Sequence, residues 1–320
     1  TGQGMLVAVM DTGLDLNYTT WGNFQTGIRR VHEAFTEDSF KSELNDSELR
    51  YTYGSLARFL QTTQLMATTG IDGQKITYGN NDLYKNRKVP YAADYADGDL
   101  NVMPAESDHG THVAGTIAGY AETAEGEVIF SGVAPDAQLA IMKVFPDTAD
   151  SGAEEGVILA ALEDALLLGA DVVNLSLGST AGFSSADNEL DLIYERIASH
   201  DIVVAIAGGN DNTSSYQNMW GTNQNPTAHP DNATINSPAI YANATAVGSA
   251  NNANGMSAYF AYGDTKVAYT ESRGLNVTFD ALAALGELEF VVVPGLGEAA
   301  DYAGLDVAGK VALVKRGTIN

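Results

Sequence analysis

Short apolar segments alternate with amphipathic segments over most of this chain, from Met5 to about Ala250. The apolar segments have the length of buried strands, and the segments between them repeat apolar residues at roughly helical spacing. The expected strands are residues 6–11, 138–144, 171–175 and 202–206, and the expected helices are residues 152–168 and 187–199. Strands and helices that alternate in this way form right-handed β-α-β units. The fold class is therefore predicted to be α/β, with a mostly parallel sheet flanked by helices.

Two stretches interrupt the alternation. Residues 22–106 are polar and weakly periodic, and we interpret them as an insertion that includes a possible helix over 46–62. Near the end of the chain the pattern becomes β-like, in the segments 275–279, 288–293 and 311–314. The sequence therefore predicts an α/β domain over residues 1–265 and the beginning of a second, β-rich module over 266–320.

Charge and cysteine content exclude several classes of protein. The chain has 41 acidic against 16 basic residues and a formal net charge of −25, which repels phosphate backbones, so no nucleic-acid partner is expected. This acidic surface is either simply solvated or attractive to cations. Without cysteine there is no disulfide scaffold, thiol nucleophile or cysteine-ligated zinc. No apolar stretch approaches the ~20 residues of a membrane span.

Three polar residues occupy positions where an α/β fold places its active site. Asp11 ends the first apolar run, His109 opens a helix-like run of small residues, and Asn210 follows another apolar run. The segment Ser176-Leu177-Gly178 also lies just past an expected strand. Because parallel sheets bind ligands at the carboxyl ends of their strands, we expect one shared cleft.

A carboxylate, an imidazole and a carboxamide in one cleft are the parts of a hydrolytic site. The carboxylate orients the imidazole, which acts as general base, and the amide donates a hydrogen bond to an oxyanion. Each residue also has a structural alternative: Asp11 closes a turn, His109 caps a helix, and Asn210 lies in a turn. A metal role for His109 and His112 is disfavoured, because zinc-protease helices space their histidines by four and carry a glutamate between them.

The strings Asp11-Thr12-Gly13, His109 to Gly115 and Ala207 to Asn210 resemble, in this order, the motifs of subtilisin-type serine proteases. The resemblance covers about Gly2 to Ala250. It implies that Asp11 is the triad acid, His109 the general base and Asn210 the oxyanion donor. It also implies substrate binding by Ser151, Gly152, Ser176, Leu177, Gly178, Ala207, Gly208 and Gly209.

One branch of that family is more similar than the others. The strings 229–231, 237–239 and 304–317 resemble the cell-envelope proteinases of Gram-positive bacteria, the lactocepin and C5a-peptidase group. The resemblance implies an extracellular or cell-envelope location and a protein or peptide substrate. It also implies that residues 266–320 begin a protease-associated domain, which in that group is inserted before the nucleophilic serine.

The nucleophilic serine itself is missing from these 320 residues. The family places it in a Gly-Thr-Ser turn, and no such string occurs in the chain. We therefore expect a C-terminal segment of the same protein to supply it, either after nicking (autoprocessing) or in a longer chain; the alternative is a non-catalytic pseudoprotease or binding module. No cofactor is required for this chemistry, and no catalytic metal is expected. The acidic string from Asp94 to Asp99 is a possible site for a structural calcium ion.

Overall fold

The computed structural model describes residues 1–19, 29–31, 33–68, 79–148, 152–179, 189–210, 235–250, 259–268 and 286–315. The chain divides into two compact units. The first comprises Thr1–Thr20 and Gly27–Ala250, and the second comprises Trp21–Thr26 and Asn251–Asn320. No helix in the described ranges is long and apolar enough to cross a membrane.

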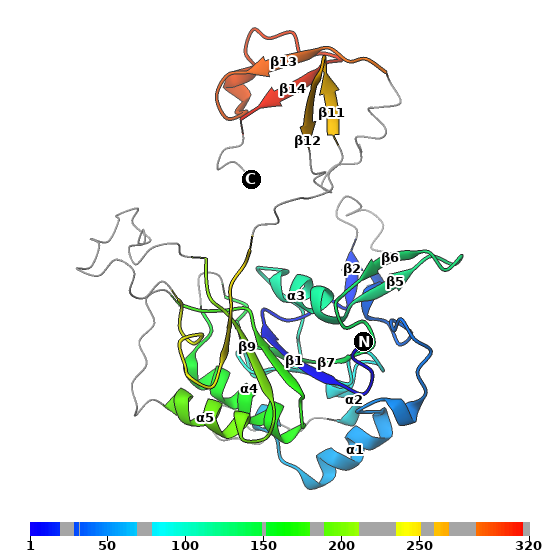
Figure 1. Ribbon diagram of the computed structural model, residues 1–320, viewed down its shortest axis with the longest axis vertical. Helices are drawn as coiled ribbons and strands as arrows, with labels where there is room; N and C mark the ends of the chain where they lie inside the picture. Colours follow the sequence, from blue (N-terminus) through cyan, green and yellow to red (C-terminus); the bar gives the residue numbers. More distant parts are fainter. Residues whose placement is uncertain are drawn as a thin grey trace, which may run out of the picture. The chain divides into compact units, whose positions relative to one another are not determined.

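The first unit is built on a six-stranded sheet in the order β10-β9-β8-β1-β7-β4, in which every neighbouring pair is parallel (Figure 1). The strands are β1 (Leu6–Asp11), β4 (Tyr91–Asp94), β7 (Gln138–Lys143), β8 (Val172–Leu175), β9 (Val203–Ala207) and β10 (Thr245–Val247). This confirms the predicted α/β class. It also places the carboxyl ends of all six strands at one edge of the sheet.

Both faces of the sheet are buried, and β1 in its centre shows why. Leu6, Ala8 and Met10 pack into one core, and Val7 and Val9 pack into the other. Helices α4 (Glu155–Leu167) and α5 (Glu189–Ala198) cover the first face, and α3 (His109–Ala118) covers the second (Figure 1). Because successive side chains of a strand point to opposite faces, a strand between two cores is apolar throughout.

Smaller elements lie just before and within the stretch that we interpreted as an insertion, and after α3. They are β2 (Asn17–Thr19), β3 (Arg29–Val31), η1 (Glu33–Phe35), η2 (Asp46–Glu48), α1 (Tyr53–Thr62), η3 (Met66–Thr68), α2 (Asn80–Leu83), β5 (Tyr120–Glu122) and β6 (Val128–Ser131). The helix expected over 46–62 forms only in its second half. Thr52 is extended and caps α1 by accepting a hydrogen bond from the backbone of Ser55, so the helix begins after it.

Strand β4 was not predicted. It is a fully buried edge of the central sheet and pairs with β7 from Tyr91 to Asp94. Its four residues follow a proline and contain two alanines, so the apolar signal is short and weak. Part of the polar stretch therefore belongs to the central sheet.

The second unit has two small sheets in its described part. Strands β11 (Tyr259–Tyr262) and β12 (Thr265–Ala268) are antiparallel, whereas β13 (Phe290–Val293) and β14 (Val311–Val314) are parallel. The short helix η4 (Ala299–Tyr302) lies between β13 and β14 in the sequence. The strands expected within 288–293 and 311–314 are present, and the one expected at 275–279 lies outside the described residues.

Candidate active site

Asp11 and His109 are 98 positions apart in the sequence and in direct contact in the fold. The Oδ1 atom of Asp11, at the carboxyl end of β1, lies 2.8 Å from Nδ1 of His109, the first residue of α3. The Asp11 side chain is 1% exposed and the His109 side chain 51% exposed. The carboxylate is thus shielded from water while the ring remains accessible to a reactant. In this arrangement a carboxylate can orient an imidazole that exchanges protons.

Hydrogen bonds of Thr12 link the end of β1 to the start of α3. Its backbone N–H donates to Oδ1 of Asp11 at 2.8 Å, so this oxygen contacts both the threonine and the imidazole. Its hydroxyl accepts from the N–H of Gly110 at 2.9 Å and donates to the carbonyl of Ser107 at 2.8 Å. These bonds fix the first turn of α3 against the strand that carries the acid.

Gly110 permits this close approach, and its replacement by alanine is a direct test. A Cβ atom at Gly110 would lie 2.4 Å from the carbonyl oxygen of Gly13 and 3.1 Å from Cβ of Asp11. We expect Gly110→Ala to displace α3 and to destabilise the unit by about 1–3 kcal/mol in thermal unfolding. Gly156→Ala in α4 is the matched control, because a Cβ there meets nothing within 4 Å. It should be neutral or stabilise by up to about 1 kcal/mol, and equal losses for both variants would contradict the packing argument.

Asn210 lies at the same edge of the sheet as Asp11. It follows β9, which is separated from β1 only by β8, and it is exposed. The preceding Gly208 donates to the carbonyl of Val247 at 2.8 Å, and Gly209 has a φ of +98°. Because a positive φ is strained for other residues, the glycine allows the chain to turn and present Asn210.

The segment Ser176-Leu177-Gly178 follows β8 and therefore lies between the ends of β1 and β9. The next residue, Ser179, exchanges two backbone hydrogen bonds with Ser237, at 2.9 and 3.0 Å. Ala207, Gly208 and Gly209 end the neighbouring strand. The expected substrate-binding residues on β8 and β9 thus share one sheet edge with Asp11. Gly152 is exposed ahead of α4, and Ser151 lies outside the described residues.

The order of the motifs along a parallel sheet and the contact between acid and imidazole point to one family. A profile of the Subtilase family (peptidase S8) matches residues 2–284 of the sequence. This chain belongs to the Subtilase family. The resemblance expected from the three motifs is confirmed.

Three relatives illustrate the branch. The PII-type proteinase of Lacticaseibacillus paracasei is 28% identical over 330 residues, which cover 100% of this subtilase chain and 15% of the relative. The minor extracellular protease Vpr of Bacillus subtilis is 32% identical over 294 residues (89% of this chain, 32% of Vpr). The C5a peptidase of Streptococcus pyogenes is 30% identical over 247 residues (74% and 17%). The expected similarity to the lactocepin and C5a-peptidase group is therefore confirmed, and the chain spans at most a third of the length of these relatives.

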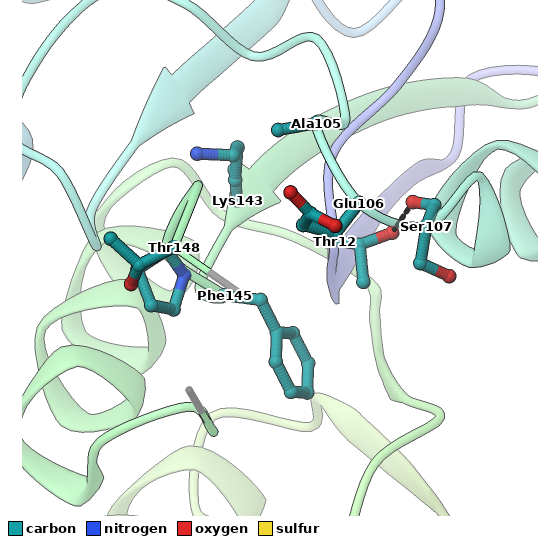
Figure 2. Close-up of a pocket in the computed structure, with 8 residues that line it drawn as sticks. Thr12, Ala105, Glu106, Ser107, Lys143, Phe145 and Thr148 are labelled. Carbon is teal, nitrogen blue, oxygen red and sulfur yellow. Dashed lines mark hydrogen bonds between the residues drawn. The ribbon is translucent and has the colours of Figure 1, made fainter. Parts of the chain in front are cut away.

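A pocket with a volume of about 120 Å³ lies beside Thr12, which follows Asp11 at the end of β1. Figure 2 shows Thr12, Glu106 and Ser107 on one side of it and Lys143, Phe145 and Thr148 on the other. Thr12 and Ser107 are also the residues that fix the start of α3, so the pocket lies next to the Asp11–His109 pair. Ala105 and Pro146 complete the lining.

Sequence reasoning did not identify the pocket residues or Asn236. Asn236 is 7% exposed and packs against Gly209, where a Cβ atom would lie 2.4 Å from its carboxamide carbon. The one available signal for the pocket was Lys143, a charged residue that ends a strand with an apolar interior. Among the described residues, no group of three or more His, Asp or Glu side chains is arranged to hold a metal ion, and the calcium site stays a prediction. Asp94 and Asp97 of that predicted site bind Lys143.

Proposed function

We propose that this chain forms the N-terminal part of the catalytic domain of a serine endopeptidase that hydrolyses peptide bonds in proteins. The observation that carries the proposal is the 2.8 Å contact between a buried Asp11 carboxylate and a half-exposed His109 ring. The nucleophilic serine belongs to a C-terminal segment of the same protein. Residues 266–320 begin a protease-associated domain, and the enzyme works outside the cell or in the cell envelope; the name of the minor extracellular protease Vpr supports this location.

The proposed reaction uses each residue at one step. His109 takes the proton of the serine hydroxyl as its oxygen attacks the carbonyl carbon of the substrate, and Asp11 stabilises the imidazolium that forms. The carbonyl oxygen becomes an oxyanion that accepts a hydrogen bond from the Asn210 carboxamide. His109 then returns the proton to the leaving amine as the peptide C–N bond breaks. Water enters, gives a proton to His109 and attacks the acyl-enzyme; the serine regains that proton as the acid product leaves.

The peptide backbone of the substrate is proposed to bind as an added strand. Ser176, Leu177 and Gly178 follow β8 at the sheet edge, and an extended peptide would pair with this segment through main-chain hydrogen bonds. Ala207, Gly208 and Gly209 wall the neighbouring side-chain pocket, and Ser151 and Gly152 line the opposite side. A structural calcium ion remains part of the proposal, with no role in the chemistry.

The test is whether the full-length protein reacts with a fluorophosphonate probe and cleaves a denatured protein substrate. We expect one labelled serine, identified by peptide mass spectrometry, in a segment outside these 320 residues. The second candidate is a pseudoprotease that uses the same cleft to bind proteins. A full-length protein that binds peptides without labelling or cleavage would establish the pseudoprotease.

A further inference from the structure

Lys143 is a buried lysine surrounded by three carboxylates. Its side chain is 1% exposed, and its Nζ atom lies 2.5 Å from Oδ2 of Asp94, 2.7 Å from Oδ2 of Asp97 and 2.8 Å from Oδ1 of Asp147. Burial alone would lower the pKa of Lys143, but its bonds to Asp147, Asp94 and Asp97 raise the pKa above the usual range. The ammonium group donates hydrogen bonds to Asp94 and Asp97 and forms an ion pair with Asp147.

The three carboxylates come from two loops at the catalytic edge. Asp94 ends β4, Asp97 lies in the turn that follows, and Asp147 lies in the loop after β7. The loops also bind each other, because Oδ2 of Asp97 accepts from the backbone N–H of Asp147 at 2.9 Å. Within the first turn, Oδ1 of Asp94 accepts from the N–H groups of Ala96 and Asp97 at 2.8 and 2.9 Å. The ammonium group is therefore the point at which both loops meet.

Lys143 also contacts the strand that carries the catalytic acid. It is the register partner of Asp11 in the pairing of β1 with β7, and the next residue, Val144, donates to the Asp11 carbonyl at 3.0 Å. A Cβ atom built on Gly13 would lie 3.2 Å from Cδ of the lysine, so the side-chain stem packs beside the Asp-Thr-Gly turn. The pocket beside Thr12 is lined by Lys143 and by Phe145, which lies two residues before Asp147 in the loop after β7.

We infer that Lys143 is a positioning residue whose ammonium group acts as a built-in cation and ties the loop after β7, which lines the pocket beside Asp11, to the turn after β4. The inference rests on the proposed peptidase function. Without the ammonium group, three carboxylates converge on one point and repel each other, which separates the loops. A buried ion pair is weak evidence for stability alone, so we assign the cluster to the geometry of the pocket.

The distances in this cluster suggest a rescue experiment. Calcium binds carboxylate oxygens at about 2.3–2.6 Å, close to the separations around Nζ, so a divalent cation can replace the ammonium group once the side chain is shortened. In the full-length protein, we expect Lys143→Ala in the presence of chelator to raise KM for a peptide substrate about tenfold and to change kcat less than about threefold. Millimolar calcium chloride should restore KM in this variant. It should not do so in Lys143→Met, whose side chain fills the space without a charge.

Lys310→Ala is the matched control, because Lys310 also contacts two carboxylates, at 3.1 and 3.3 Å, but on the surface of the second unit. It should leave KM unchanged. Hydrogen exchange of residues 94–99 and 144–148 gives a readout independent of catalysis: exchange should rise in Lys143→Ala and fall again with calcium. The inference is overturned if Lys143→Ala keeps the wild-type KM and exchange in chelator, or if calcium affects the Ala and Met variants equally. A wild-type protein that cleaves no peptide refutes the proposed function and leaves the exchange test intact.

Discussion

His109→Ala in the full-length protein is expected to abolish measurable peptide hydrolysis. Loss of the general base in a subtilisin lowers kcat by about 10⁶-fold, because the serine hydroxyl is a weak nucleophile unless its proton is removed. His109 is suited to this role because its ring is accessible and bound to a buried carboxylate. Initial rates with a chromogenic peptide and the rate of fluorophosphonate labelling both measure the loss.

The matched control is His112→Ala on the same helix. His112 is exposed three residues further along α3, and its carbonyl accepts a hydrogen bond from the hydroxyl of Thr116 that does not depend on the ring. We expect this variant to keep its rate within a few-fold of the wild type. Full labelling of His109→Ala, or an equal loss in both variants, would show that the assigned base is wrong.

Asp11→Asn is expected to lower kcat about 10⁴-fold without unfolding the protein. An asparagine carboxamide fits the same space, but it carries no charge to stabilise the imidazolium and can present an N–H to Nδ1 of the ring, which favours the wrong tautomer. Asp15→Asn is the control, because it removes the charge of a nearby carboxylate that is not assigned to stabilise the imidazolium. It should change kcat far less. A small effect of Asp11→Asn in a correctly folded protein would contradict the role of the 2.8 Å contact.

The candidate catalytic residues could be predicted because their signals are local. Each of Asp11, His109 and Asn210 lies at the boundary of a strand or helix, and the rule that parallel strands end at one edge brings the three boundaries together. The sheet was predictable for the same reason, since strands buried on both faces form continuous apolar runs. Strand β4 was missed because four residues after a proline carry too little of this signal.

The contacts around the site were not predictable because their partners lie far apart in sequence. Lys143 meets Asp94 and Asp97 from positions 49 and 46 residues away. The acidic string that contains these two residues predicted a calcium site, but no sequence rule pairs it with a lysine on another strand. The cavity beside Thr12 depends on the packing of three separate segments. Such contacts follow from the folded chain and leave no periodic pattern.

Asp164 is another buried carboxylate whose partners lie far away in the sequence. Its replacement is expected to have the largest effect on stability. It lies on α4 with 0% exposure. Its Oδ1 accepts from the N–H of Met66 at 2.6 Å, and its Oδ2 accepts from the N–H of Ala67 at 2.9 Å and from the hydroxyl of Tyr95 at 2.8 Å. The carboxylate thus anchors η3 and the end of β4 to the helix, over sequence separations of 69 to 98 residues.

Asp164→Ala should destabilise the first unit by about 3 kcal/mol or more, because two backbone N–H groups lose their only carboxylate acceptor in a buried place. Thermal unfolding of the full-length protein measures the loss, and hydrogen exchange at residues 66–67 locates it. Glu163→Ala is the matched control on the adjacent position. Glu163 is partly exposed and binds Arg196 at 2.6 Å, and a surface ion pair of this kind contributes about 0–1 kcal/mol. Equal losses for the two variants would contradict the anchoring role.

The loss of stability caused by Asp164→Ala is expected to depend on pH. Burial raises the pKa of Asp164 to about 6, although the bonds from Ala67, Met66 and Tyr95 oppose the rise. Between the ordinary value near 3.8 and about 6, the folded state therefore binds more protons at this residue than the unfolded state does. The contribution of Asp164 to stability is complete below about pH 4 and decreases as the pH rises through about 6. Because alanine does not titrate, the difference in unfolding free energy between wild type and Asp164→Ala should be larger at pH 4 than at pH 7. A difference that grows with rising pH would show that the carboxylate is ionised throughout.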